Sequence, residues 1–496
     1  MFETVELGQK IDKEHYEHEI KRLRVELVNA QYDLRRADFP VVIVLNGDDR
    51  QACADVLNGM REWMDARYLQ IHALGRPTVE QLKHPFFWRY WRRLPRKGRI
   101  GVFMGDWVSR TIASCLQDGI DDATLALQLG HIRRFERAIV DDGALLLKYW
   151  FHLPRKQHKK RLKKTKQGGR RTWRIRPEDK LIYEKYDEVL KLAEHIIHET
   201  STAQATWTLI EATDRHYTDL HTAETLLISL KRRLEAPPPA TPERAHKIKE
   251  QSPAKVREVS KSVLDTVDLS RSIPWGKYRK ELDRHQAKLN RLSSKAARKG
   301  LASVFAFEGW DAAGKGGIIR RLTAAMDARD YNIIPVAAPT AEEKAHHYLW
   351  RFWQQIPRDG RTTIFDRSWY GRVLVERVED FASETQWRRA YDEINEFETL
   401  LMEHGILVLK FWIHIDADEQ LRRFQAREDT SYKQYKITEE DYRNREKWDD
   451  YVRAVDEMAT RTSSNGAPWH LVAANDKRSA RLEVIETYCK ALEQRL

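Results

Sequence analysis

The sequence has few cysteines and lacks any long apolar run. Its three cysteines, Cys53, Cys115 and Cys489, are scattered, so we expect neither a disulfide framework nor a cysteine metal cluster. No stretch approaches the roughly 18 apolar residues of a membrane-spanning helix, and residues 1–15 lack the basic-then-apolar pattern of a secretion signal. We therefore expect a protein of the reducing cytoplasm, without a membrane partner.

Acidic residues are outnumbered. The chain has 87 Lys and Arg against 75 Asp and Glu, a net charge of +12, and a pI near 9.3. This balance favours a polyanionic partner, such as nucleic acid, acidic lipid or a phosphate polymer. The 16 tryptophans argue against a disordered chain, and 496 residues favour two domains, each with its own core.

The most informative stretch is FEGWDAAGKGGIIRR, residues 307–321. A run of strand formers precedes it and a helical apolar pattern follows it, which is the context of a phosphate-binding loop. Gly309, Gly314, Gly316 and Gly317 would let backbone N–H groups approach phosphate oxygens at a helix N-terminus. Lys315 would reach the outer phosphates, so the stretch predicts a nucleotide or polyphosphate site.

This loop departs from the usual pattern in two ways. The residue after Lys315 is Gly316, where a Ser or Thr normally meets magnesium, and a carboxylate, Asp311, lies inside the loop. A carboxylate among phosphate-binding groups requires a cation between them, so Asp311 is interpreted as a magnesium-organising or acceptor-activating group. The alternative is a glycine-rich turn that binds nothing.

The chain contains an internal repeat with an offset of 262 residues, the separation of Asp49 and Asp311. The segment HPFFWRYWRRLPRKGR from position 84 falls on HHYLWRFWQQIPRDGR from position 346, and GALLLKYWFH from 143 on GILVLKFWIH from 405. A match this long at one offset indicates duplication of a whole domain.

The first copy has lost the chemical residues of the second. Its loop keeps Asp49, but Ala52 and Cys53 stand where Gly314 and Lys315 would be. We therefore expect a catalytically inactive domain at residues 1–235 and a catalytic one at 263–496. The proline-rich, polar stretch within 236–262 is predicted to be the linker.

In the second half, apolar runs at 301–307, 333–336, 362–365, 406–415 and 470–473 alternate with helical patterns. Alternation of this kind predicts an α/β domain, a parallel sheet with helices on both faces. Ligands of such sheets bind at the carboxyl ends of the strands, where the motifs of this chain fall.

A second motif, TTIFDRSWYGRVLVERV, begins at residue 362. Its strand ends at Asp366, which would hold magnesium across from the loop, and Arg367 would clamp a phosphoryl oxygen. The first copy has Met104 and Gly105 at these positions, so both groups are absent there. The alternative is an ordinary surface pair at the end of a strand.

Three further stretches carry less specific signals. Residues 419–451 are helical and basic, and predict either a lid that closes over phosphates or a salt-bridged surface. Residues 154–171 hold ten Lys or Arg and no acid. This composition predicts either a solvated loop or a strip that binds a polyanion. The turn at Asn475, Asp476 and Lys477 is interpreted as base-binding or structural, without a choice between them.

Taken together, EGWDAAGKGG, PTAEEKAHHYLWRFW, IFDRSWYGRVLVERV, WDDYVRAVDEMATRTSS and APWHLVAANDKRSARL resemble the type-2 polyphosphate kinase family. The resemblance covers essentially all of residues 270–496. It implies two tandem copies of a three-layer α/β/α, phosphate-loop-kinase-like domain with a helical lid, the first copy degenerate. It also implies transfer from polyphosphate, with Mg²⁺, and the fused arrangement points to AMP as acceptor.

Carried over by position, the resemblance implies catalytic roles for Asp311, Lys315, Asp366, Arg367 and Arg427, with Mg²⁺ held by Asp311 and Asp366. Phosphate binding is further assigned to Arg423, Lys433 and Lys436. Partners would be polyphosphate and AMP, with no nucleic acid and with a homo-oligomer left open. The competing interpretations are a polyphosphate-dependent nucleoside diphosphate kinase, an ATP-dependent nucleoside monophosphate kinase and a non-enzymatic polyanion binder.

Overall fold

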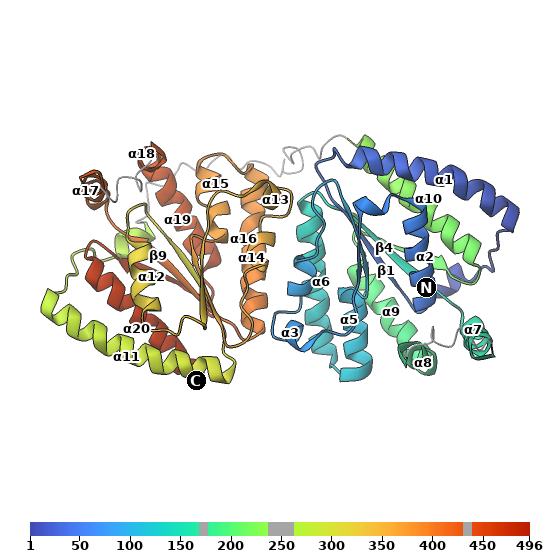
Figure 1. The fold of residues 1–496 in the computed structure, drawn as a ribbon, viewed down its shortest axis with the longest axis horizontal. Coiled ribbons are helices and arrows are strands. Elements are labelled where there is room, and N and C mark those ends of the chain that lie inside the picture. The colour runs from blue at the N-terminus through green and yellow to red at the C-terminus, as the bar shows by residue number, and fades with distance from the viewer. Residues whose placement is uncertain (168–176, 237–261, 430–438) are drawn as a thin grey trace, which may run out of the picture. The chain divides into compact units, whose positions relative to one another are not determined.

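A computed structural model describes residues 1–167, 177–236, 262–429 and 439–496. The described residues form two compact units, each built around one five-stranded sheet (Figure 1). Most of the predicted linker lies outside the described residues. Among the helices that are described, none has the length and apolar character needed to cross a membrane.

The second unit contains the parallel sheet predicted for this half, in the order β10-β9-β6-β8-β7. Its strands are β6 (Ser303–Gly309), β7 (Tyr331–Pro335), β8 (Thr362–Asp366), β9 (Leu407–His414) and β10 (Trp469–Ala473). In the central strands β6 and β9 nearly every residue is buried, as expected for strands covered on both faces. Phe307 on β6 lies in register with Asp366 on β8, which brings the two motifs to one edge.

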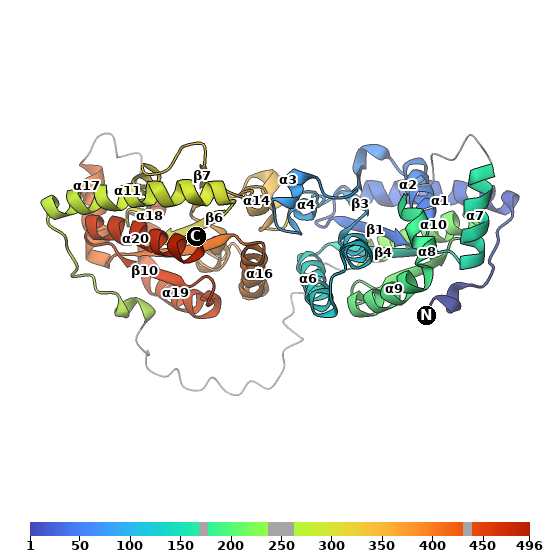
Figure 2. The same cartoon turned by 90° about the horizontal axis from the view of Figure 1, so that it is seen from below.

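Helices cover both faces of this sheet (Figures 1 and 2). On one side α11 and α12 pack against α20, and on the other α16 packs against α19. The helices are α11 (Trp275–Lys299), α12 (Lys315–Thr323), α16 (Glu384–Glu403), α17 (Ala417–Glu428), α18 (Glu439–Glu446), α19 (Trp448–Thr462) and α20 (Lys477–Arg495). The short helices in this half of the chain are α13 (Ala341–Lys344), which groups with the first unit, α14 (Trp350–Trp353) and α15 (Val375–Val378).

The first unit has a sheet of matching order, β2-β3-β1-β4-β5. Its strands are β1 (Val41–Gly47), β2 (Leu69–Ala73), β3 (Ile100–Met104), β4 (Leu145–His152) and β5 (Trp207–Glu211). The longer helices are α1 (Lys13–Leu34), α2 (Arg50–Trp63), α5 (Trp107–Ala113), α6 (Asp122–Asp141), α7 (Arg155–Gln167), α8 (Pro177–Glu184), α9 (Tyr186–Thr200) and α10 (Arg215–Glu235). The short helices in this half of the chain are α3 (Val79–Leu82), which groups with the second unit, and α4 (Trp88–Trp91).

The two units repeat each other down to single buried contacts. In the first, the Nζ atom of Lys148 lies 2.7 Å from the Glu136 carboxylate and 2.6 Å from the Thr200 carbonyl oxygen. In the second, Lys410 makes the same contact with Glu398, also at 2.7 Å. Both lysines are fully buried, where an ion pair persists only if its partners are fixed. The predicted duplication and α/β fold are confirmed.

The structure contradicts one of the two interpretations of the basic stretch at residues 154–171, that of a solvated loop. Residues 155–167 form helix α7 rather than a loop, because the segment consists mostly of Lys, Arg, Gln and Leu, which have good helix propensity, and contains no Gly or Pro. The two glycines that follow, at 168 and 169, lie outside the described residues.

Candidate active site

The loop between β6 and α12 depends on two glycines. Gly309 has φ +140°, and a Cβ atom there would lie 2.4 Å from the carbonyl oxygen of Ile413 on β9. Gly314 has φ +110° and immediately precedes Lys315, the first residue of α12. Such backbone conformations are accessible mainly to glycine. The glycines therefore set the path of the loop and aim the N-terminus of α12 at the strand ends, while Gly316 and Gly317 lie in its first turn.

Lys315 folds back over this loop. Its Nζ atom donates to the carbonyl oxygens of Gly309, at 2.7 Å, and Trp310, at 3.2 Å. Burial and the charge of Arg367 lower the pKa of the Lys315 ammonium, against the opposite influence of Asp311 and Asp366. The lysine thus sits at the phosphate-loop position expected from the sequence, among both predicted carboxylates.

The Asp311 carboxylate receives donors from two directions. Arg367 Nη2 donates to Oδ1 at 2.8 Å, and Asn444 Nδ2, from helix α18, donates to Oδ2 at 3.1 Å. Burial raises the pKa of Asp311, but the charges of Lys315 and Arg367 outweigh it, so that the pKa lies below its usual value. Asp311 is therefore an ionised group held in place at neutral pH.

Asp366 is the last residue of β8, and Arg367 follows it with φ +65°, in the left-handed region. Ala312 in the loop has φ +61°. Non-glycine residues adopt this conformation at a cost, and such residues cluster at functional sites. The backbone N–H of Arg367 donates to the carbonyl oxygen of Phe307 on β6, which holds the strained residue beside the loop.

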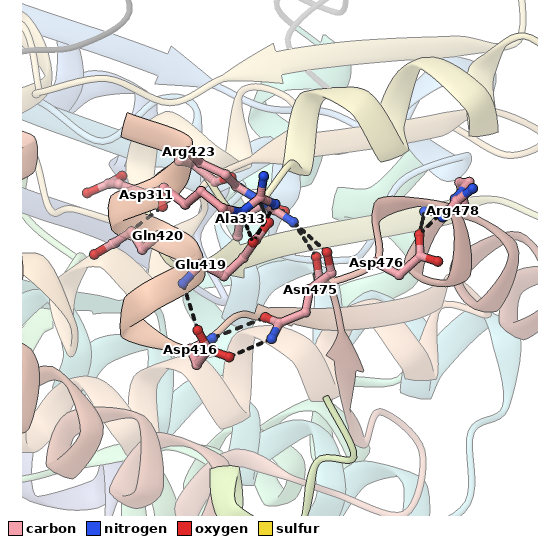
Figure 3. Close-up of polar contacts among 12 residues, drawn as sticks. Asp311, Ala313, Asp416, Glu419, Gln420, Arg423, Asn475, Asp476 and Arg478 are labelled. Carbon is pink, nitrogen blue, oxygen red and sulfur yellow. Dashed lines mark hydrogen bonds and ion pairs between the residues drawn. The ribbon is translucent and has the colours of Figure 1, made fainter. Parts of the chain in front are cut away.

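Arg423, on helix α17, is buried and fully engaged (Figure 3). Its guanidinium has five N–H donors. Nη1 donates to the carbonyl oxygens of Ala312 and Ala313, at 3.0 and 2.7 Å, and Nε donates to Glu419. Nη2 donates to the carbonyl oxygens of residues 474 and 475, at 2.6 and 3.1 Å. Arg423 thus ties helix α17 to the loop after β6 and to the turn after β10.

The structure says less about the other cationic residues that the sequence assigned to phosphate binding. Arg427 lies in the last turn of α17 and is partly buried. Lys433 and Lys436 lie outside the described residues. Their predicted phosphate contacts stay predictions.

The turn after β10 makes contacts within the protein (Figure 3). Asn475 donates to the carboxylate of Asp416, the N-cap of α17, and accepts from its backbone N–H. Asp476 caps α20 by accepting from the N–H of Arg478 at 2.7 Å. Of the two roles left open by the sequence, these contacts favour the structural one.

An aromatic stack holds Trp310, a residue of the glycine-rich loop. The ring of Trp310 stacks on Trp448 of α19, with centroids 3.6 Å apart and planes inclined by 7°. Its Nε1 atom donates to Nδ1 of His414 at 3.0 Å, and burial lowers the pKa of this histidine to about 4. The accepting Nδ1 is therefore unprotonated at neutral pH.

Beside the loop lies a cavity of about 170 Å³. Asp311, Arg367 and Asn444 line it, together with groups that the sequence did not single out: Glu308, Arg351, Ser368, Gln420 and Trp412. Arg351 is oriented by donating to the Ala337 carbonyl oxygen at 3.0 Å. Glu308, Arg351 and Ser368 lie within the quoted motifs, but nothing in the motifs marks them as cavity residues, because they come from separate elements that meet only in the fold.

Glu308, the residue before Gly309, is a second buried acid of this cavity. Its Oε1 atom accepts from the backbone N–H and the hydroxyl of Ser368, at 2.8 and 2.7 Å. Burial raises the pKa of Glu308, and these bonds offset part of the increase. It joins the ends of β6 and β8 behind Arg367.

The donor set suits a magnesium ion. Asp311 and Asp366 follow or end neighbouring strands, and the described residues contain no group of three or more potential ligands from His, Cys, Asp and Glu. Mg²⁺ typically keeps several waters and binds through one or two carboxylates together with substrate phosphates. The carboxylates of Asp311 and Asp366, beside the glycine-rich loop, match this mode of magnesium binding.

The matching positions of the first unit are arranged differently. Asp49 pairs with Arg161 of α7 and caps α2 by accepting from the Gln51 N–H at 3.1 Å. Cys53 is buried where the lysine would be, and burial raises the pKa of its thiol. The surviving carboxylate thus has a structural partner.

Comparison with known proteins agrees with this site. The model of the polyphosphate kinase 2 (PPK2) family matches residues 10–237 and 274–496. The chain belongs to the polyphosphate kinase 2 family. It is 45% identical to a polyphosphate:AMP phosphotransferase of Pseudomonas aeruginosa, with 99% of each chain covered, and 44% identical to one of Pseudomonas syringae, with 100% and 98% covered. The resemblance drawn from the sequence motifs is confirmed.

A solved structure is similar over the whole length of this PPK2 chain. A crystal structure described as a polyphosphate kinase 2 of Pseudomonas aeruginosa superimposes with a TM-score of 0.89 at 43% identity. The match covers 100% of this chain and 99% of that one. The arrangement of two PPK2 domains in one chain is thus shared with a solved structure over its whole length.

Proposed function

We propose that the chain is a polyphosphate:AMP phosphotransferase, which transfers the terminal phosphoryl group of inorganic polyphosphate to AMP and releases ADP. One observation carries the proposal: the chain is 45% identical, over 99% of both lengths, to a protein of that name. The glycine-rich loop of the second half, beside a cavity, is consistent with it. The first half is proposed to be catalytically inactive.

In the reaction an oxygen of the AMP phosphate attacks the terminal phosphorus of polyphosphate. The bond from that phosphorus to the next bridging oxygen breaks, and the chain leaves one phosphate shorter. Protein groups contribute mainly by positioning the reactants and neutralising charge. Lys315 and Arg367 are placed to neutralise the transferred group, since both lie against the loop.

The cavity beside Asp311 is proposed to hold the acceptor phosphate. Asp311 orients the attacking oxygen, while Arg367 and Asn444 hold the Asp311 carboxylate in one orientation. Mg²⁺, the proposed cofactor, would be held by Asp311 and Asp366 and would supply further charge neutralisation. The lid helices α17 and α18 contact the loop through Gln420 and Asn444, and would exclude water as a competing acceptor.

Arg423 is proposed to position rather than to bind phosphate. All five of its donors have partners within the protein, three of them on the loop and its own helix. Arg427, by its place one turn further along α17, is proposed to meet the phosphates.

The test is ADP formation from AMP and magnesium, with long-chain polyphosphate or ATP as donor in parallel reactions. We expect ADP with polyphosphate and none with ATP, and loss of the product in Lys315→Ala and Asp366→Ala. ADP with ATP alone would identify a nucleotide kinase and overturn the proposal. Phosphorylation of nucleoside diphosphates but not of AMP would show that the acceptor is a nucleoside diphosphate, and would overturn the proposed acceptor.

A further inference from the structure

The first unit contains a cavity of about 500 Å³ at the carboxyl ends of β1, β2 and β3. It corresponds by position to the cavity of the second unit. Gly47 and Trp150 line it, and Gly309 and Trp412, which lie 262 residues later, line the other. The loss of the catalytic groups has thus left a larger space, not a filled one.

The charge of this cavity is reversed relative to the catalytic one. Its described lining includes no Asp or Glu but four arginines: Arg50, Arg76, Arg89 and Arg110. The lining of the catalytic cavity includes three acids, Glu308, Asp311 and Glu376, against two arginines, Arg351 and Arg367. Arg110 lies 3.4 Å from Asp118, and Arg76 donates to Gln117 at 2.7 Å, so two of the arginines are held at the rim. A basic cavity without carboxylates attracts an anion and lacks the carboxylate ligands that Mg²⁺ prefers.

Two buried donors of the lining have no acceptor within the described protein. Arg89 is 6% exposed, and its Nη2 atom donates to the Gly75 carbonyl oxygen at 3.1 Å, but its Nε atom has no partner. Trp150 is 1% exposed, and its Nε1 atom also has none. Buried donors are nearly always satisfied in native proteins, so each points to an acceptor that a ligand brings.

The rest of the lining is apolar. Leu45, Met104 and Ile112 come from the sheet and α5, and Leu181, Ile182 and Val189 from helices α8 and α9. Ligand sites of several hundred Å³ typically combine such walls with a few polar groups that fix orientation. An apolar body with an anionic group fits this combination, and an aromatic base with a phosphate has that chemistry.

We propose that this cavity binds a nucleoside phosphate, without metal and without turnover. The proposal extends the assignment of the catalytic cavity to its counterpart, and rests on the proposed function for the choice of AMP as probe. Arg76 and Arg110 contact the phosphate at the rim, Arg89 and Trp150 donate to the ligand inside, and the base lies against the apolar wall.

The experiment counts AMP molecules bound per chain of the full-length protein by equilibrium dialysis with radiolabelled AMP, magnesium being chelated. Arg76→Glu reverses a charge at the rim, and Leu116→Trp fills the cavity from its own lining. In each variant we expect one fewer bound AMP per chain than in the wild type, or an affinity at that site lowered by at least about tenfold. The kcat for ADP formation should not change.

Arg67→Glu is the matched control, because Arg67 is an exposed arginine of the same unit that pairs with Asp65, away from the cavity. It should bind as many AMP molecules as the wild type. Equal AMP binding in the wild type, Arg76→Glu and Leu116→Trp would overturn the proposal, even with ADP formation intact. Tripolyphosphate that occupies the site while AMP does not would also overturn it, in favour of a phosphate-chain site. Absence of ADP formation would instead count against the proposed reaction.

Discussion

Arg367 donates a 2.8 Å hydrogen bond to Asp311 across the space between the end of β8 and the phosphate loop. Both residues lie where parallel strands end, since Phe307 on β6 is in register with Asp366. The pair sets two opposite charges side by side before any substrate arrives. Such preorganisation costs little reorganisation during a reaction, which is how fixed charges lower a barrier.

The first prediction compares Asp311 with its counterpart in the first unit. Asp311→Asn keeps the shape but removes the charge, and should lower kcat for ADP formation by about 10²- to 10³-fold. Asp49→Asn should keep kcat within about twofold, or roughly 0.4 kcal/mol on the barrier. Asp49 pairs with Arg161 and caps α2, and Asn is also a good helix cap. Loss of activity in Asp49→Asn would contradict the inactivity proposed for the first half.

Much of the fold followed from local patterns. The five apolar runs of the second half became β6 to β10 with ends shifted by one or two residues, because buried parallel strands are continuous apolar segments. The internal repeat with an offset of 262 residues predicted a second sheet of the same kind in the first half, and the strand order of the first sheet matches that of the second. The glycine-rich loop also formed where expected, since Gly309 and Gly314 adopt positive φ angles.

The surroundings of the loop could not be predicted in the same way. Asn444 of α18 and Gln420 of α17 donate to Asp311, and Trp448 stacks on Trp310 from more than 130 residues away. Pairings over such separations depend on tertiary packing rather than on periodicity. Arg423 shows the limit most clearly, because nothing in its spacing distinguishes a phosphate ligand from an arginine whose donors all serve the protein.

The second prediction tests that distinction. Arg423→Lys offers three donors in place of five, so carbonyl oxygens of the loop lose partners. The free energy of unfolding should fall by about 2–4 kcal/mol. At a temperature where the protein stays folded, kcat should fall by about tenfold through misplacement of the loop, with the KM for polyphosphate nearly unchanged.

Arg422→Lys is the control, because Arg422 is the exposed neighbour that pairs with the same Glu419. Its stability should change by less than about 0.5 kcal/mol. A raised polyphosphate KM with unchanged kcat in Arg423→Lys would instead assign Arg423 a direct contact with the donor.

The third prediction concerns ionic strength. The chain carries a net charge of +12, and a polyanionic donor releases counterions when it binds a basic surface. The KM for long-chain polyphosphate should rise by about tenfold or more between 0.05 and 0.2 M salt. The KM for AMP, which carries only two charges, should rise much less. A polyphosphate KM that is indifferent to salt would argue against a long basic binding surface.

The fourth prediction follows from the hydrogen bond between Trp310 and His414. Burial lowers the pKa of His414 to about 4, against an ordinary value of 6.5, so the folded protein holds the neutral ring. The unfolded chain binds a proton below pH 6.5 and the folded protein does not until about pH 4. Stability is therefore unaffected above about pH 6.5 and falls as the pH drops from there to about 4.

At pH 5 this group should lower the free energy of unfolding by about 2 kcal/mol relative to pH 7. His414→Gln supplies an acceptor that does not titrate, so its stability should depend less on pH by that amount. Urea unfolding of both proteins at the two pH values measures the difference, in which the other titrating groups cancel. Equal pH dependence in the two proteins would mean that the His414 pKa is the same in the folded protein and in the unfolded chain. Trp310 would then be held mainly by its stack on Trp448.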